Sequence, residues 1–456
     1  MEFILYSVAL LAAIFLLFTA IEKPYFVASI LVFFFIYNLN LELPGPLDAR
    51  GLLTVVLFAR LFLFDKQNYT LVKNYLLRDL NGILLIIFLV LSFYTSYSYY
   101  GGLQNLLKLN ILLIVSLILG FIIVINGEGK KVFFNAIILS GILTTFDIIY
   151  STMVYGQLQI RSFIKVLLLG DTTGGNHNAF GLICALALVL VYIFFIRKQI
   201  PKKISFILMF ILSFGVLIST SRSSLIALLI VLIISFLVQK EITFNLNKVL
   251  TTSLGVIIFF VSFYFAYNTL LSSGQFKSSF IDKTYYRLYE EPMSFFGGNE
   301  NQVFDKWGDK MEGTSRGRLE RTMTDISKYS QLDLEIQLFG LGLKGYIFNK
   351  FGGDRYNAHN GYVLLLIERG IIGLLIFIFC IVNLSIKSFR LLRRNFIDTP
   401  IIYIFLILVF YSIGQNAELT NNLAFLFFGA IIANTKEHLI SEEVKDDELV
   451  LLSLNK

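Results

Sequence analysis

Long apolar runs separated by short polar connections make up most of the chain. A helix of about 20 residues crosses the hydrocarbon core of a bilayer. Runs near that length occur at 3–20, 25–38, 51–64, 80–98, 106–126, 132–155, 178–196, 204–220, 224–239, 248–270, 361–386, 400–414 and 421–435. Because two of the early runs are short, the pattern predicts an all-α polytopic membrane protein with about 12–14 transmembrane helices.

Basic residues gather in the connections that follow every second run. These connections are 65–79, 127–131, 197–203, 240–248 and 387–395. Lys and Arg in short loops favour the cytoplasmic side, so all five are expected there and the alternate connections outside. The first run has no basic residue before it, so we expect it to be retained as a span and not cleaved as a signal peptide.

The apolar runs divide the chain into four parts. We expect an N-terminal transmembrane bundle at 1–270, an extracytoplasmic cap loop at 271–358, C-terminal transmembrane helices at 359–435 and a cytoplasmic tail at 436–456. The cap is polar and carries several glycines and Trp307. It is expected to be folded, with a helix around 315–330.

Composition narrows the class of protein. Hydrophobic residues make up 56% of the chain, charged residues 15%, and the mean hydropathy is +0.75, against about 25% charged residues in soluble domains. The net charge of +7 is spread over short loops, so topology explains it better than nucleic-acid binding. The two cysteines, Cys184 and Cys380, lie in separate apolar runs and predict neither a disulfide framework nor a CxxC metal site. There is no phosphate-loop motif, no dinucleotide fingerprint and no metal-ligand spacing, so we expect no nucleotide substrate, metal or cofactor.

Arg222 is the first candidate for binding chemistry. It lies in "LISTSRSSLIALL", in a turn of a few residues between two spans, on the side where basic residues are unusual. One interpretation is a guanidinium that reaches the lipid headgroups. The other is an anion site, because the planar fork of arginine donates two hydrogen bonds to phosphate oxygens.

A second basic cluster lies in the cap. In "TSRGRLERTMTDI", Arg316, Arg318 and Arg321 fall within six residues and form a local positive patch. A solvated helix, in which Arg321 pairs with Glu320 or Asp325, is the alternative. "GGNHNAFG" places Asn178 at the outer start of a span, where its amide caps the helix or binds a sugar or phosphate.

His359 opens "HNGYVLLLIERGIIG", at the outer end of a span. An imidazole with a pKa near 6.5 is a ready proton acceptor at neutral pH, although interfacial histidines without a chemical role are common. At 100° per residue, Gly370 and Gly373 lie near the same helix face and allow another helix to pack closely. Glu368 and Arg369 would be costly inside the span without partners, so both are expected to face protein or water and to be paired.

These motifs resemble the O-antigen ligase and O-antigen polymerase superfamily over about residues 170–375. "HNGYVLLLIERGIIG" fits its pattern of histidine, a small amide or hydroxyl residue, nine residues and Gly-x-x-Gly, and "STSRSSL" resembles its Ser-Arg turn. "GRLERT" followed by "FGLGLKGY" resembles its Gly-Arg segment and glycine-rich lead-in, and "NHNAFG" its Asn-containing helix start. Leu374 stands where the ligase form has Gly, Thr or Tyr, which leaves ligase and polymerase both open.

The resemblance implies a GT-C-like membrane glycosyltransferase. It would take a glycan from an undecaprenyl-diphosphate carrier on the outer face of the bacterial plasma membrane, with inversion and without metal or nucleotide. Arg222 and Arg318, with Arg316 beside them, would hold the diphosphate, and His359 would take the proton from the acceptor hydroxyl. Asn178 and Asn360 are candidate substrate-binding residues. The implied partners are the lipid-linked donor, a glycan or lipid-core acceptor, membrane lipids and a chain-length regulator protein.

Two other classes of protein remain as alternatives. A transporter or flippase of lipid-linked oligosaccharide also has many spans, but transporters tend to show repeated halves and polar residues near the membrane midplane. Here the candidate groups gather on one side. A non-catalytic scaffold would leave Arg222, Arg318 and His359 unexplained.

Overall fold

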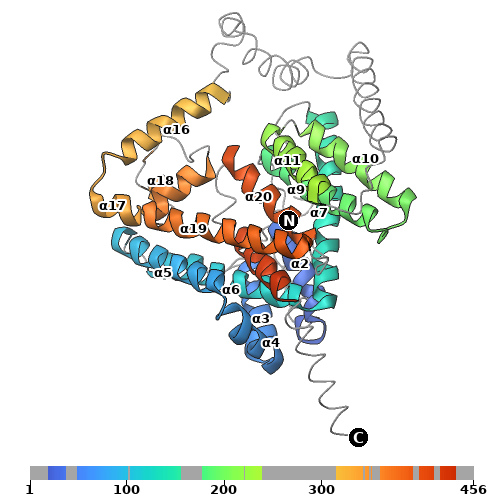
Figure 1. Ribbon diagram of the computed structural model, residues 1–456, viewed down its shortest axis with the longest axis horizontal. Coiled ribbons are helices and arrows are strands. Elements are labelled where there is room, and N and C mark those ends of the chain that lie inside the picture. Colours follow the sequence, from blue (N-terminus) through green and yellow to red (C-terminus); the bar gives the residue numbers. More distant parts are fainter. Residues whose placement is uncertain are drawn as a thin grey trace, which may run out of the picture.

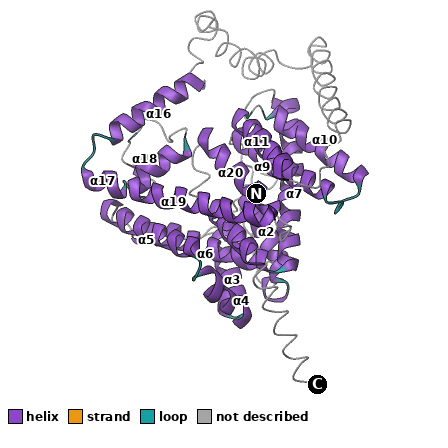
Figure 2. Cartoon of the chain, in the orientation of Figure 1, coloured by secondary structure: helices purple, strands orange, loops and turns teal. Residues whose placement is uncertain are grey.

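The computed structural model describes residues 19–36, 49–100, 103–155, 177–219, 221–238, 315–342, 345–348, 351, 360–393, 400–414 and 422–437. Every regular element within these ranges is helical (Figure 2), which confirms the all-α prediction. Among them, Gly127–Tyr150, Asn178–Ile196 and Gly361–Arg390 are long and apolar enough to cross a membrane, and the bent pair Lys66–Leu76 and Leu80–Ser92 is a fourth candidate. The described part of the chain is therefore all-helical, with helices long and apolar enough for a multi-pass membrane protein.

The helices follow the apolar runs closely (Figure 1). They are α2 (Pro24–Ile36), α3 (Ala49–Phe58), η1 (Ala59–Leu63), α4 (Lys66–Leu71), η2 (Val72–Leu76), α5 (Leu80–Tyr100), α6 (Leu103–Ile125), α7 (Gly127–Tyr155), α9 (His177–Ile196), α10 (Lys202–Ile218), α11 (Arg222–Val238), α16 (Ser315–Tyr329), α17 (Leu334–Phe339), α18 (Gly345–Phe348), α19 (Gly361–Arg393), α20 (Pro400–Gly414) and a last helix at 422–437. The predicted span 248–270 and most of 3–20 lie outside the described residues.

A single apolar cluster holds the transmembrane helices together. In it α9 packs against α7, α10, α11 and α20, while α5 packs against α19. The backbones of α6 and the last helix approach closely, because a Cβ on Gly120 would overlap the carbonyl of Leu426 and a Cβ on Gly429 that of Leu117. Small residues at such a crossing replace side-chain contact with direct backbone packing, as is common between membrane helices.

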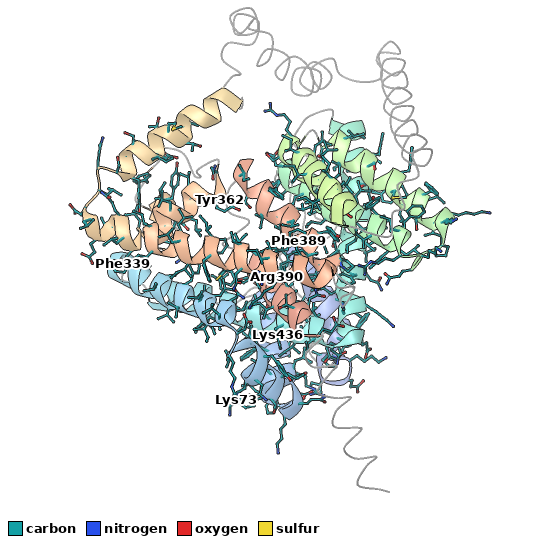
Figure 3. The ribbon with its side chains drawn as sticks, viewed as in Figure 1. Lys73, Phe339, Tyr362, Phe389, Arg390 and Lys436 are labelled. Atoms are coloured by element: carbon teal, nitrogen blue, oxygen red, sulfur yellow. The ribbon has the colours of Figure 1, made fainter. Side chains whose placement is uncertain are left out.

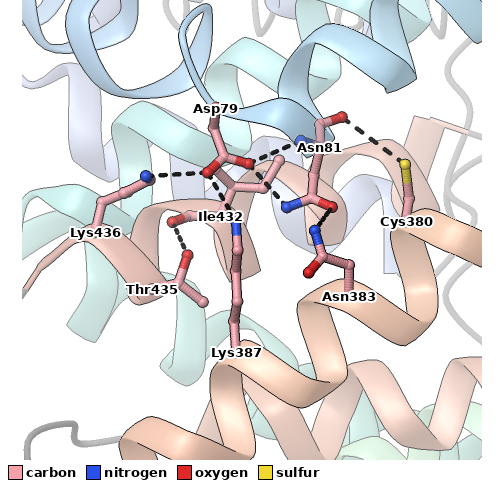
Figure 4. A network of polar contacts seen from close by, with 8 residues as sticks. All are labelled: Asp79, Asn81, Cys380, Asn383, Lys387, Ile432, Thr435 and Lys436. Atoms are coloured by element: carbon pink, nitrogen blue, oxygen red, sulfur yellow. Dashed lines mark hydrogen bonds and ion pairs between the residues drawn. The ribbon is translucent and has the colours of Figure 1, made fainter.

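A polar network joins three chain segments at one end of the bundle (Figure 4). The Nζ atoms of Lys387 and Lys436 lie 3.1 and 3.0 Å from one carboxylate oxygen of Asp79, which is 3% exposed. The other oxygen accepts hydrogen bonds from the backbone N–H and side-chain amide of Asn81, at 2.9 and 2.8 Å. All three segments belong to regions predicted to be cytoplasmic. The contacts among these three segments support the prediction that they lie on one side of the membrane.

A second ion pair joins one further region predicted on that side, 127–131, to the same tail segment that carries Lys436. The Nζ atom of Lys130, at the start of α7, is 2.7 Å from a carboxylate oxygen of Glu437 in the last helix. Lys436 next to it belongs to the Asp79 network. The predicted cytoplasmic connections at 65–79, 127–131 and 387–395 therefore gather around the end of the last helix.

A separate apolar cluster forms where the cap meets α19. It joins α16, the segment after α17, α18 and the first turns of α19 through Tyr329, Leu341, Tyr346, Val363, Leu364 and Ile367. The Tyr346 hydroxyl donates a hydrogen bond to Asp325 at 3.0 Å, and both side chains are buried. The helix predicted around 315–330 is confirmed as α16, and this cluster fastens it to α19.

Helix α19 is broken at Gly370, where φ is 67° and ψ is −178°. The carbonyls freed by the break find partners in the cap: the N–H of Leu341 donates to Ile367 at 2.8 Å, and the N–H of Gly342 donates to Glu368 at 2.9 Å. The helix expected to run without interruption through Gly370 is therefore broken there, and the predicted face shared with His359 lies outside the described residues.

The close packing predicted at Gly370 is confirmed, although its partner is the cap helix α17. A Cβ on Gly370 would overlap the carbonyl of Leu338, and a Cβ on Gly340 would lie 2.5 Å from the backbone nitrogen of Arg369. Gly340 also has a positive φ, 81°, with an extended ψ of 178°. This region of backbone space is essentially restricted to glycine. The two glycines thus form a reciprocal backbone contact between the cap and α19.

Tyr329 of α16 also contributes to the contact between the cap and α19. Its hydroxyl donates a hydrogen bond to the Gln337 carbonyl in α17. Burial raises the pKa of Tyr329 to about 12, and a hydrogen bond from the Ile371 backbone, just after the break, opposes this only in part. The hydroxyl therefore stays protonated, and able to donate, at neutral pH.

Candidate functional site

The starts of α9 and α11 meet through a turn of serines. The Ser224 hydroxyl donates to the backbone carbonyl of Asn178 at 3.3 Å, and the hydroxyl oxygens of Ser221 and Ser224 lie 2.7 Å apart. All three residues are buried. The two sequence motifs that contain Arg222 and Asn178, far apart in the chain, are therefore neighbours in the fold.

Gly181 allows this contact. A Cβ there would lie 2.5 Å from the Ser219 hydroxyl oxygen and 2.6 Å from the Ser221 Cβ. Gly181, Ser219 and Ser221 lie within the sequence motifs, but the motifs alone predict no role for them. The sequence features that indicate this contact are a glycine in the first turn of one helix and a run of serines before another helix.

Replacing Gly181 with alanine should separate the serine turn from α9. We expect the free energy of unfolding to fall by about 2 kcal/mol, the usual effect of inserting a methyl group into a close-packed contact. Thermal unfolding of the purified protein measures the change. Gly127→Ala is the matched control, because a Cβ there has no atom within 4 Å. Equal unfolding temperatures for the two variants would show that the serine turn adjusts without loss.

Arg222 is the first residue of α11 and is partly buried. The free N–H groups and the dipole of a helix favour negative charge at its N-terminus. Helix α9 begins nearby at His177, so two helix starts and one guanidinium favour an anion at this place. Asn178 lies within the first turn of α9 and is 7% exposed.

His359 lies outside the described residues, and Asn360 is the first described residue after it. The Asn360 side-chain oxygen accepts hydrogen bonds from the backbone N–H groups of Tyr362 and Val363, at 2.9 and 3.2 Å. It is thus the N-terminal cap of α19. The Tyr362 hydroxyl donates to the Val409 carbonyl of α20 at 3.1 Å, which connects the start of α19 to that helix. Figure 3 labels Tyr362 among the side chains.

The starts of α9 and α19 lie at the end of the bundle away from the ion pairs. In α19, Lys387 of the Asp79 network is near the other end of the helix. The last turn of α9 lies at the same end as Lys130. Phe194 in that turn contacts Phe134, which is near Lys130 at the start of α7, with 5.5 Å between ring centroids. Helix α20 packs against α9, α11 and α19. The Arg222 turn and the segment that follows His359 are therefore on the same side of the molecule.

Arg316 and Arg318 lie in the first turn of α16, for which the structure describes the backbone only. Helix α16 is placed by its contacts with α19 and by the Asp325–Tyr346 hydrogen bond. Figure 1 shows α16 beyond α18, on the side of α19 away from α5. The contacts of α16 with α18 and α19 come from Asp325 and Tyr329, in the second half of the helix, and the closeness of Arg316 and Arg318 to Asn360 belongs to the proposal below.

Glu368 and Arg369 are the two charged residues inside the predicted span, and the structure shows the surroundings of both. Glu368 and Arg369 are 4% and 3% exposed, so both face protein, as predicted. The guanidinium of Arg369 lies 5.5 Å from the ring centroid of Phe88 and interacts electrostatically with Glu368, although its three nitrogens have no hydrogen-bond partner within the described part of the chain.

No group of three or more His, Cys, Asp or Glu side chains that could hold a metal occurs among the described residues. No curated protein matches the chain by sequence. A family model does match, and its segment contains Arg222, Arg316, Arg318, His359 and Asn360, while Asn178 precedes it. Residues 207–378, from α10 into α19, match the family model described as O-antigen ligase, which confirms the resemblance over this segment.

Proposed function

We propose that the protein is a membrane glycosyltransferase that transfers or polymerises an undecaprenyl-diphosphate-linked oligosaccharide on the outer face of the plasma membrane. The family implies ligase-type or polymerase-type chemistry with a lipid-linked glycan and an acceptor. The carrier, the membrane face, inversion at the sugar carbon and independence of metal belong to the proposal.

The chemistry follows from the proposed roles of the residues. His359 accepts the proton of the acceptor hydroxyl as that oxygen attacks the sugar carbon. Arg222 and Arg318, with Arg316 beside Arg318, bind the diphosphate and stabilise the negative charge that grows on it as it leaves. A single displacement of this kind inverts the configuration at the sugar carbon.

The contact between Ser224 and Asn178 is the observation that carries the proposal. It places Arg222 at a junction of two helix starts, where an anion is favoured. The capped start of α19, directly after His359, lies on the same side through Tyr362 and α20. A base and an anion site on one side of the bundle are what transfer from a diphosphate carrier requires.

Reconstitution in liposomes tests the reaction and identifies the acceptor. We expect the purified protein to form a new glycosidic bond from an undecaprenyl-diphosphate glycan in the presence of EDTA and without nucleotide. A product ladder from the donor alone indicates a polymerase, and a product that needs a lipid-core acceptor indicates a ligase. Mass spectrometry detects the bond, and NMR gives its anomeric configuration.

A transporter of the same lipid is the second candidate, and the break at Gly370 favours it, since discontinuous helices are common at transport sites. However, the carbonyls freed at Ile367 and Glu368 are occupied by Leu341 and Gly342 of the cap. A transporter would use such groups for its cargo. Movement of the donor across the liposome membrane without any new glycosidic bond would reject the transferase in favour of this function.

A further inference from the structure

The helix that precedes α5 turns along one end of the bundle. This surface helix, which consists of α4 and η2 at Lys66–Leu76, makes an angle of 92° with α5. Helix α5 has 21 residues and is long enough to span the membrane by itself. The surface helix therefore joins two predicted spans, 51–64 and 80–98, on one side of the membrane. A helix bent by 92° between such spans follows the membrane surface.

The two acidic residues at the ends of the surface helix are occupied within the protein. Asp65 caps its start, because the carboxylate accepts hydrogen bonds from two backbone N–H groups of the first turn, at 3.0 and 3.1 Å. Asp79, which follows its end, is held by Lys387 and Lys436. These contacts fix the surface helix at both ends and leave neither carboxylate to balance its basic side chains.

Three basic side chains of this segment are exposed: Lys66, Lys73 and Arg78. None of them takes part in the ion pairs formed within the described part of the chain. Figure 3 shows Lys73 at the outer edge of the molecule, below Lys436 in that view. The segment therefore presents positive charge that is complementary to an anionic partner outside the protein.

Large apolar side chains are exposed beside these cations. The exposed fractions are 60%, 78%, 48% and 39% for Leu63, Phe64, Tyr69 and Leu77. The ring of Tyr69 also contacts Phe62 of η1, with 5.5 Å between the centroids, which fixes its position. Lys66, Tyr69 and Lys73 follow one another at intervals of three and four residues, so they lie on one helix face. Basic side chains beside exposed aromatic and aliphatic ones are typical of a helix that lies in a membrane interface.

We propose that the surface helix is a docking surface for anionic phospholipid headgroups, in the leaflet on the side of the Asp79 network. Lys66, Lys73 and Arg78 contact the lipid phosphates, and the exposed apolar side chains enter the boundary between headgroups and acyl chains. The surface lies at the end of the bundle away from the Arg222 turn. It does not depend on the proposed transfer reaction.

Lipid-dependent stability in dodecyl maltoside tests this surface. Phosphatidylglycerol should raise the unfolding temperature of the purified protein by several degrees more than phosphatidylcholine does at the same concentration. The triple variant Lys66→Gln, Lys73→Gln and Arg78→Gln should lose most of this difference. Its apparent affinity for phosphatidylglycerol should fall at least about tenfold, because each cation near an anionic surface contributes about fivefold.

The basic loop between α9 and α10 provides the matched control. Lys198, Lys202 and Lys203 are also exposed and belong to a connection predicted on the same side. Their joint replacement with glutamine should leave the response to phosphatidylglycerol unchanged, because they lie in a turn and at a helix start, not along a surface helix. An equal loss in both triple variants would show a general attraction of charge and would overturn the assignment to the surface helix.

A spin label measures the depth of the surface helix without reference to affinity. Both native cysteines are buried, so a label on Phe64→Cys or Asn74→Cys reports on the new position. In nanodiscs that contain phosphatidylglycerol, the label at position 64 should be the more accessible to oxygen, and the label at position 74 the more accessible to a water-soluble nickel complex. Equal access of the nickel complex at both positions, or an unchanged lipid preference in the Lys66, Lys73 and Arg78 variant, would contradict the proposal.

Discussion

Replacement of His359 with alanine is expected to lower glycan transfer by about 10²–10⁴-fold, the usual contribution of a general base. The proposed base would then be missing when the acceptor hydroxyl attacks the donor sugar. The unfolding temperature should stay close to that of the wild type, since the substitution removes a side chain and leaves the Asn360 cap of α19 in place. Initial rates of bond formation in liposomes, at saturating donor and acceptor, measure the effect.

The pH profile distinguishes a base from a residue that only shapes the site. The wild-type rate should rise with pH as the imidazole loses its proton and becomes able to accept one from the acceptor hydroxyl. The residual activity of His359→Ala should lack this rise. His438→Ala, in the predicted tail and outside the family segment, is the matched control and should retain both the rate and the profile. A full rate in His359→Ala would remove this residue from the mechanism.

The apolar runs predicted the helices well because hydropathy is a local property. The run 178–196 became His177–Ile196, and 80–98 became Leu80–Tyr100. The positive-inside rule also assigns 65–79 and 387–395 to one common side, and Asp79 and Lys387 from these two segments are in contact. Such predictions succeed because the membrane imposes the same requirement on each helix and each short loop separately.

The contacts between α9 and α11 and between the cap and α19 could not be predicted, because they depend on residues far apart in the chain. The serine turn and the start of α9 were each recognised as motifs, but the hydrogen bond from Ser224 to Asn178 spans 46 positions. Gly370 looked like a helical glycine because its apolar neighbours continue the helical pattern. Its break exists only because Leu341 and Gly342 supply the hydrogen bonds that the helix gives up.

The second large effect is expected from Gly370→Ala. An L-residue at this φ of 67° and extended ψ is strained, and the added Cβ would overlap the Leu338 carbonyl. We expect the free energy of unfolding to fall by about 3 kcal/mol from strain and overpacking together. Transfer should fall about 10²-fold, because a displacement of about 1 Å at a reacting group has that effect. Thermal unfolding and initial rates measure the two changes.

The losses of stability and of transfer both follow from the position of the break in α19 at Gly370. The half of α19 before Gly370 begins at the Asn360 cap, directly after His359, and its apolar side chains form the cluster that holds the cap. Gly340→Ala should repeat both losses from the other side of the contact, since its Cβ would meet the backbone at Arg369. Gly127→Ala should show neither loss. Full transfer by a destabilised Gly370→Ala would mean that the cap is held for stability alone, and that the base is positioned by the Tyr362 contact with α20.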